Sequence, residues 1–141
     1  MSGPLEDVRI LDLTRLLPGG FCTLLLADLG ADVIKVEDTG QGDYVRWAPP
    51  YYGSDEQTPL GTRSAIYLSL NRNKRSIRLD LKHEQARQAL IRLAETADVL
   101  VESFRPGVLD RRVARTPVGD AVACRRPRPT VRCRTRRACI A

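Results

Sequence analysis

The stretch LADLGADVIKVE at residues 26–37 decides the fold of this chain of 141 residues. Its first part completes an apolar helical pattern over residues 21–29, Gly30 ends that helix, and residues 32–37 form a run typical of a buried strand. Another apolar run, residues 8–13, precedes the helix. The sequence therefore predicts a β-α-β unit with parallel strands and a right-handed connection.

The rest of the chain continues this alternation. Residues 38–64 are rich in Gly, Pro, Tyr and Asp, which predicts a long excursion, and residues 64–70 fit either a strand or a short helix. Polar and apolar residues alternate over residues 76–81, which predicts a strand with one solvent-exposed face. An apolar helical stripe over residues 83–97 and a buried strand at residues 99–101 follow. We expect an α/β fold with a mostly parallel sheet and flanking helices.

The residues Ala-Asp-Val occur at two places where a predicted helix is followed by a predicted strand. Asp32 stands at the first place and Asp98 at the second. Aspartate at such a turn commonly bonds nearby backbone groups, so we predict structural rather than catalytic roles for both residues.

The charge of the chain is divided unevenly along its length. Residues 1–111 carry 14 Lys and Arg against 16 Asp and Glu, whereas residues 112–141 carry nine Arg against a single acidic residue. The net charge of +6 thus belongs to the tail, and the body is slightly acidic. This distribution argues against a nucleic-acid partner for the body.

Metal binding and membrane insertion find no support in the sequence. The chain has one histidine, His83, and four cysteines without a C-x-x-C pair, so no metal site is predicted. No run approaches the roughly 18 apolar residues of a membrane span, and the N-terminus lacks the pattern of a signal peptide. We expect a cytoplasmic protein.

Two segments carry candidate ligand-binding side chains. The first, residues 71–75 (NRNKR), places amides and cations on a linker that enters a strand, which suits a nucleotide or pyrophosphate. A solvated charge run that discourages edge pairing is the alternative. The second segment is residues 102–111 (ESFRPGVLDR). A weaker phosphate signal is the Pro-Gly-Gly turn at residues 18–20, which matches neither common phosphate-binding motif.

Several ordered blocks resemble the N-terminal part of the family III CoA-transferases, which include carnitine-CoA and formyl-CoA transferases and α-methylacyl-CoA racemases. The blocks are residues 3–5 (GPL), 8–14 (VRILDLT), 18–19 (PG), 26–37, 42–43 (GD), 73–76 (NKRS) and 102–109 (ESFRPGVL). The resemblance covers residues 3–111 and only part of a family protein.

This resemblance implies a Rossmann-like α/β fold, here as an incomplete domain, and homodimers of interlocked subunits. It implies acyl-CoA thioesters as substrates and no permanently bound cofactor. In the transferases an aspartate attacks the thioester, CoA leaves and returns, and CoA moves between two acids. Two alternatives stay open: the racemase branch, in which a His and an Asp move the α-proton, and a non-catalytic module that binds a nucleotide or CoA.

The resemblance also assigns CoA-binding residues in both segments. They are Asn71, Asn73, Lys74, Arg75, Ser103, Phe104, Arg105 and Arg111. One departure is Asp38, which stands where many relatives have an Arg at the nucleotide phosphate site. No catalytic residue is carried over, because the family's catalytic residues lie beyond residue 111 in family order. We therefore expect this chain alone to show negligible transferase activity.

Residues 112–141 differ in composition from the rest. They contain nine Arg, three Cys and three Pro but no Lys, which predicts a disordered tail separate from the domain at residues 1–111. This composition is typical of GC-rich coding DNA read out of frame, so our hypothesis is a frameshift near codon 112. The alternative is an Arg-rich arm that binds RNA or DNA.

Overall fold

The computed structural model describes residues 3–52, 64–105 and 108–109. Four strands within these ranges form one sheet in the order β3-β2-β1-β4, and every neighbouring pair is parallel. The strands are β1 (Arg9–Asp12), β2 (Asp32–Glu37), β3 (Lys74–Arg78) and β4 (Val99–Val101). The predicted α/β fold with a parallel sheet is confirmed.

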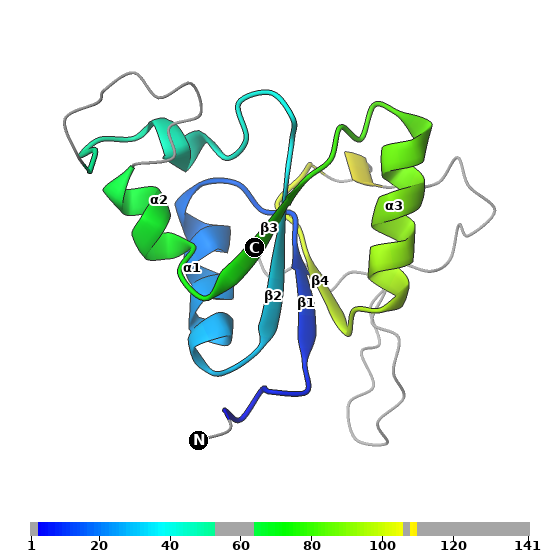
Figure 1. The fold of residues 1–141 in the computed structure, drawn as a ribbon, viewed down its shortest axis with the longest axis horizontal. Helices are drawn as coiled ribbons and strands as arrows, with labels where there is room; N and C mark the ends of the chain where they lie inside the picture. The colour runs from blue at the N-terminus through cyan, green and yellow to red at the C-terminus, as the bar shows by residue number, and fades with distance from the viewer. Residues whose placement is uncertain (1–2, 53–63, 106–107, 110–141) are drawn as a thin grey trace.

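Helices cover both faces of this sheet, as a parallel sheet requires. Helices α1 and α2 lie on one side and α3 on the other (Figure 1). The helical segments are α1 (Leu16–Asp28), the 3₁₀ helix η1 (Tyr44–Trp47), α2 (Ala65–Leu70) and α3 (Glu84–Glu95). Chain direction is the same in all four strands, so their carboxyl ends share one edge of the sheet, at the top of Figure 1.

Alternation along the strands divides the apolar core into two clusters. Leu11, Ile34 and Val36 belong to the cluster that includes Leu90 and Ile91 of α3. The strand positions between them face the opposite side of the sheet, where they pack against α1. The second cluster consists of Ile10, Ala27, Ala31, Val33 and Val101. Each face of the sheet therefore has its own core.

The α1 face also buries three ionisable strand residues. Asp12, Lys35 and Glu37 are each no more than 5% exposed. They stand at alternate positions, on the same side as Ile10 and Val33, so the pleat of the strands brings them together. Burial of these groups requires partners, and the partners determine how the loops above the sheet are held.

Helix α1 begins earlier than the sequence predicts. It starts at Leu16 rather than Phe21, so the Pro-Gly-Gly stretch lies inside its first turns and not in a separate turn. Proline is tolerated there because its missing N–H would have no helical partner. Gly19 is required by close packing: a Cβ at this position would lie 2.2 Å from the Cβ of Thr14.

Strand β3 also begins earlier than predicted. It spans Lys74–Arg78 rather than residues 76–81, so Lys74 and Arg75 lie in the sheet and not on a linker. The undecided segment at residues 64–70 is the short helix α2, capped by the Ser64 hydroxyl, which accepts a hydrogen bond from the Tyr67 N–H. The predicted domain boundary at residue 111 and the predicted tail, residues 112–141, lie outside the described residues.

Leu11→Ala is expected to destabilise the protein by about 2–5 kcal/mol, because Leu11 is fully buried between the helical layers and truncation leaves a cavity. Urea unfolding of the full chain, followed by circular dichroism, measures this loss. Leu25→Ala is the matched control, since Leu25 is 49% exposed on α1. Equal losses in the two variants would contradict the described core.

Candidate functional site

A cavity of about 470 Å³ opens at the carboxyl edge of the sheet. Residues that follow all four strands contribute to its wall. The residues that line the cavity, including the last two of β2, are Leu13, Arg15, Val36, Glu37, Asp38, Thr39, Gly40, Gln41, Tyr44, Leu79, Asp80, Leu81, Lys82 and Phe104. The carboxyl ends of parallel strands are where open α/β folds bind ligands.

The strand order places a topological switch point beside this cavity. The chain winds outward from β1 to β2 and β3 and then returns to β4 on the other side of β1. The loops after β1 and β4 therefore diverge from neighbouring strands. They remain joined: the Leu13 N–H donates to the Val101 carbonyl oxygen (2.8 Å), and the Arg15 N–H donates to the Ser103 hydroxyl (3.3 Å).

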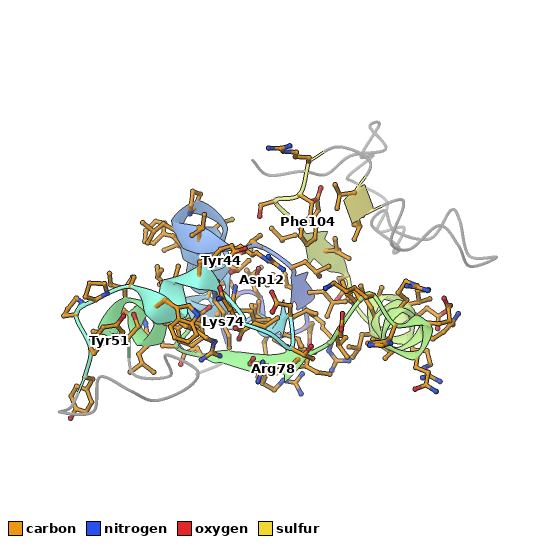
Figure 2. All side chains as sticks on the ribbon, turned by 90° about the horizontal axis from the view of Figure 1, so that it is seen from above. Asp12, Tyr44, Tyr51, Lys74, Arg78 and Phe104 are labelled. Atoms are coloured by element: carbon orange, nitrogen blue, oxygen red, sulfur yellow. The ribbon has the colours of Figure 1, made fainter. Side chains whose placement is uncertain are left out.

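The cavity wall combines flat apolar surface with charges of both signs. Phe104, Leu79 and Tyr44 supply aromatic and aliphatic surface, and Arg15 and Lys82 supply cations. Figure 2, which looks down on this edge, places Phe104 on the side opposite Arg78, in agreement with the strand order. A nucleoside that combines a flat base with polar groups fits such a wall.

Glu37 anchors the loop that follows β2. Its carboxylate accepts two hydrogen bonds from Arg46 (2.7 and 2.8 Å), one from the Asp43 N–H and one from the Tyr67 hydroxyl. Burial alone would raise the pKa of Glu37, but these hydrogen bonds outweigh burial and lower the pKa to about 2. Burial and the neighbouring Glu37 raise the pKa of Tyr67, so its hydroxyl remains a donor.

Asp43 connects the same loop to the start of α1. One carboxylate oxygen accepts from the Leu16 N–H (3.1 Å) and the Val45 N–H (3.1 Å). The other lies 2.9 Å from Lys35 Nζ, and both of these side chains are at most 2% exposed. Leu16 has a positive φ of 66°, a conformation that costs energy for a non-glycine residue, and the bond to Asp43 helps to hold it.

Lys74 completes the buried polar group from β3. Its ammonium donates to the Gly20 carbonyl oxygen (2.9 Å), the Thr23 hydroxyl (2.8 Å) and the Asn71 side-chain oxygen (3.1 Å), and it lies 3.4 Å from Asp12. Burial lowers the pKa of Lys74, although the Asp12 carboxylate offsets part of this effect. The ammonium points into the protein, and its hydrogen bonds to Gly20 and Thr23 link α1 to strand β3 of the sheet.

The first predicted binding segment lies at the amino edge of the sheet, away from the cavity. Asn73 donates to Asp28 at the end of α1 (2.9 Å), and Arg75 forms a forked pair with Asp32 at the start of β2 (2.6 Å). Asn71 donates to the Tyr67 carbonyl oxygen. The structure thus gives each of these side chains an internal partner, and their contact with CoA stays a prediction.

The second predicted segment lies beside the cavity. Phe104 lines it, the Ser103 hydroxyl binds the backbone of the loop after β1, and Arg105 is exposed. Arg111 lies outside the described residues. The structure does not bring the two predicted segments together, since a full strand length separates them.

Sequence reasoning missed the cationic part of the cavity wall, Arg15 and Lys82. The available signal was position: both follow strands, and side chains that follow parallel strands meet at one edge. His83, next to Lys82, is the N-cap residue of α3, and its side chain is 78% exposed. Asp98 accepts a bond from the Arg9 N–H (3.0 Å) and Asp32 pairs with Arg9, which supports structural roles for both.

Among the residues that the structure describes, no group of three or more His, Cys, Asp or Glu side chains is arranged to hold a metal ion. None of the helices in this part of the chain has the length and apolar character needed to cross a membrane.

Comparison with known sequences gives consistent matches. The model of the family described as CoA-transferase family III matches residues 5–118. The chain is 46% identical over 109 residues to a succinyl-CoA:mesaconate CoA-transferase of Haloarcula hispanica, which covers 77% of this chain and 26% of that protein. It is 50% identical over 107 residues to human succinyl-CoA:glutarate CoA-transferase. This match covers 75% of this chain and 23% of that protein. The chain thus spans about a quarter of the length of these curated relatives.

Solved structures show the same similarity. A CAIB/BAIF family protein from Brucella suis has a TM-score of 0.69 and 38% identity, with 79% of this chain and 29% of that chain covered. The protein Rv3272 from M. tuberculosis has a TM-score of 0.64 and 41% identity. This match covers 79% of this chain and 29% of that chain. Both comparisons agree with the described sheet and helices.

Glu37→Gln is expected to flatten the dependence of stability on pH. Because the ordinary pKa of 4.5 falls to about 2 on folding, the Glu37 carboxylate stabilises the protein fully above pH 4.5. That stabilisation, on the order of 3 kcal/mol, is lost as the pH falls from 4.5 towards 2. Urea unfolding at a series of pH values between 7 and 2.5 measures the loss.

The control for this prediction is Glu6→Gln, which removes an exposed carboxylate near the N-terminus. This variant should follow the wild-type curve, whereas Glu37→Gln should be less stable at pH 7 and lose less on acidification. Parallel curves for the wild type and Glu37→Gln would show that Glu37 does not contribute in this way.

Proposed function

The chain belongs to CoA-transferase family III, and on that premise we propose that it binds the nucleotide end of an acyl-CoA thioester in the cavity at the carboxyl edge of its sheet. The activity that we propose for the protein is transfer of CoA between an acyl-CoA and a carboxylic acid. CoA enters this reaction as part of the substrate and not as a permanently bound cofactor.

The observation that carries the proposal is the composition of the cavity at this position in the fold. The Phe104 ring offers a surface on which a purine can stack, with Leu79 as a second apolar contact. Lys82 lies at the rim and is exposed, so its ammonium can pair with a phosphate of the ligand. Ligands of open α/β sheets bind at this edge.

The proposal assigns different roles to the two segments that the resemblance implies. Ser103, Phe104 and Arg105 lie beside the cavity, and we propose that they contact the nucleotide. We propose that the buried Lys74 supports the fold, since its ammonium already has three hydrogen-bond acceptors within the protein. Asn71, Asn73 and Arg75 remain predicted contacts for a part of the ligand outside the cavity.

The names of the relatives favour transfer over racemisation. The curated proteins reported above are CoA-transferases, as is a formyl-CoA:oxalate CoA-transferase of Rhodopseudomonas palustris, 49% identical over 111 residues. No catalytic residue has been carried over to this chain, so the part of the proposal that concerns the described residues is binding. The alternative, binding without catalysis, uses the same cavity.

Two further expectations accompany this proposal. The resemblance implies a homodimer of interlocked subunits, and the sequence led us to expect a cytoplasmic location. Both remain predictions for this chain.

Lys82→Met is expected to weaken CoA binding about tenfold, because an ammonium that pairs with a ligand phosphate is lost while the aliphatic stem is kept. Isothermal titration calorimetry with CoA and the full chain measures the change. Arg92→Met is the matched control: it removes one exposed positive charge near the end of α3, and Arg92 does not line the cavity. The proposed site would be refuted if both variants lost affinity for CoA equally. It would also be refuted if neither the wild type nor the two variants bound CoA.

A further inference from the structure

The loop that follows β2, residues 38–42 (DTGQG), forms part of the cavity wall. Asp38, Thr39, Gly40 and Gln41 all line the cavity. Two of the five residues in this loop are glycines, so the free chain has much conformational freedom here. Ordering such a loop costs free energy, and this cost must be offset by contacts elsewhere in the protein.

The N–H groups of the loop are held by the Asp38 carboxylate. One carboxylate oxygen accepts hydrogen bonds from the Gly40 N–H (2.9 Å) and the Gly42 N–H (3.1 Å). The other oxygen accepts from the guanidinium of Arg15, the N-cap residue of α1 (2.9 Å). The amide side of the loop is therefore tied to the start of α1 through Asp38.

The carbonyl oxygens of the same loop converge on Arg78, the last residue of β3 (Figure 2). The guanidinium donates to the carbonyl oxygens of Asp38 (3.3 Å), Thr39 and Gly40 (3.0 Å). Successive carbonyl dipoles that point at one place repel one another, and a cation at that place offsets the repulsion. Arg78 thus supplies the hydrogen bonds that a helix or a strand partner would otherwise give to this backbone.

Arginine suits this contact better than lysine does. A guanidinium carries several N–H donors in fixed directions and can reach several acceptors at once, whereas an ammonium is a compact charge on a flexible stem. Arg78 is exposed and is not among the residues that line the cavity. Its influence on a ligand in the cavity must therefore pass through the loop or through its charge at long range.

We propose that Arg78 is a positioning residue for the cavity: it orders the loop at residues 38–42 before the ligand binds, and in this way it raises the affinity for CoA. This inference rests on the proposed function, since it concerns the ligand of the same cavity. A loop that is already ordered in the free protein loses little conformational freedom on binding. Arg78 acts through the backbone of the loop and does not itself contact the ligand.

Calorimetric titration of the full chain with CoA, at one fixed ionic strength, measures the effect. Arg78→Met should weaken CoA binding about fivefold, because the loop must then be ordered during binding. Arg92→Met is the matched control: it removes an exposed positive charge from α3 and should bind CoA as the wild type does. Arg78→Lys keeps the charge without the planar fork, so its affinity should lie between those of the wild type and Arg78→Met.

Hydrogen exchange adds a readout that a general loss of stability would not give. Without CoA, the amides of residues 39–42 should exchange faster in Arg78→Met than in the wild type. Added CoA should slow these amides more in Arg78→Met than in the wild type, because only the variant orders the loop on binding. Since Arg78 is exposed, the urea concentration at the midpoint of unfolding should stay close to that of Arg92→Met.

The outcomes separate this inference from the proposed function. Equal binding of CoA by the wild type and Arg78→Met would overturn the role of Arg78 and leave the proposed cavity intact. Full affinity in Arg78→Lys would assign the effect to charge alone, and a much lower urea midpoint for Arg78→Met, or its failure to fold, would assign the effect to general stability. Either result overturns the inference. If the wild type does not bind CoA, the proposed function and this inference are both refuted.

Discussion

The ion pair between Lys35 and Asp43 is the interaction on which the surroundings of the cavity depend. Lys35 Nζ lies 2.9 Å from the Asp43 carboxylate, and both side chains are excluded from solvent. Lys35 also donates to the Thr14 carbonyl oxygen (3.0 Å), and Asp43 accepts from the Leu16 N–H (3.1 Å). Since an unpaired buried charge is costly, these bonds hold the loops after β1 and β2 in one arrangement.

The same face of the sheet uses charge to position α1. Asp12 accepts from the Thr14 hydroxyl and the Thr23 hydroxyl, each at 2.5 Å, and lies 3.4 Å from Lys74. Among the described residues no buried side-chain N or O atom lacks a hydrogen-bond partner. A network satisfied to this extent favours a single arrangement of helix and loops, so the wall of the cavity is formed before a ligand arrives.

The sequence predicts the layers of this fold better than the contacts of its polar residues. Alternation and helical periodicity locate the strands and helices, because burial of apolar side chains has a spatial period that the sequence records. Lys74 shows the limit: the sequence places this cation in a polar cluster but does not show that its ammonium lies 3.4 Å from Asp12. Its partners Gly20 and Thr23 are more than 50 residues away in sequence, so no local pattern reveals them.

The position of the nucleotide is the central claim, and hydrogen exchange with and without CoA tests it most directly. The full chain should show slower exchange at residues 79–82 and 103–105 when CoA is added, because these backbone segments adjoin the cavity. Any change at residues 71–75, at the opposite edge of the sheet, should be smaller than the change at residues 79–82 and 103–105. Slower exchange at residues 71–75 with no change at residues 79–82 would contradict the account.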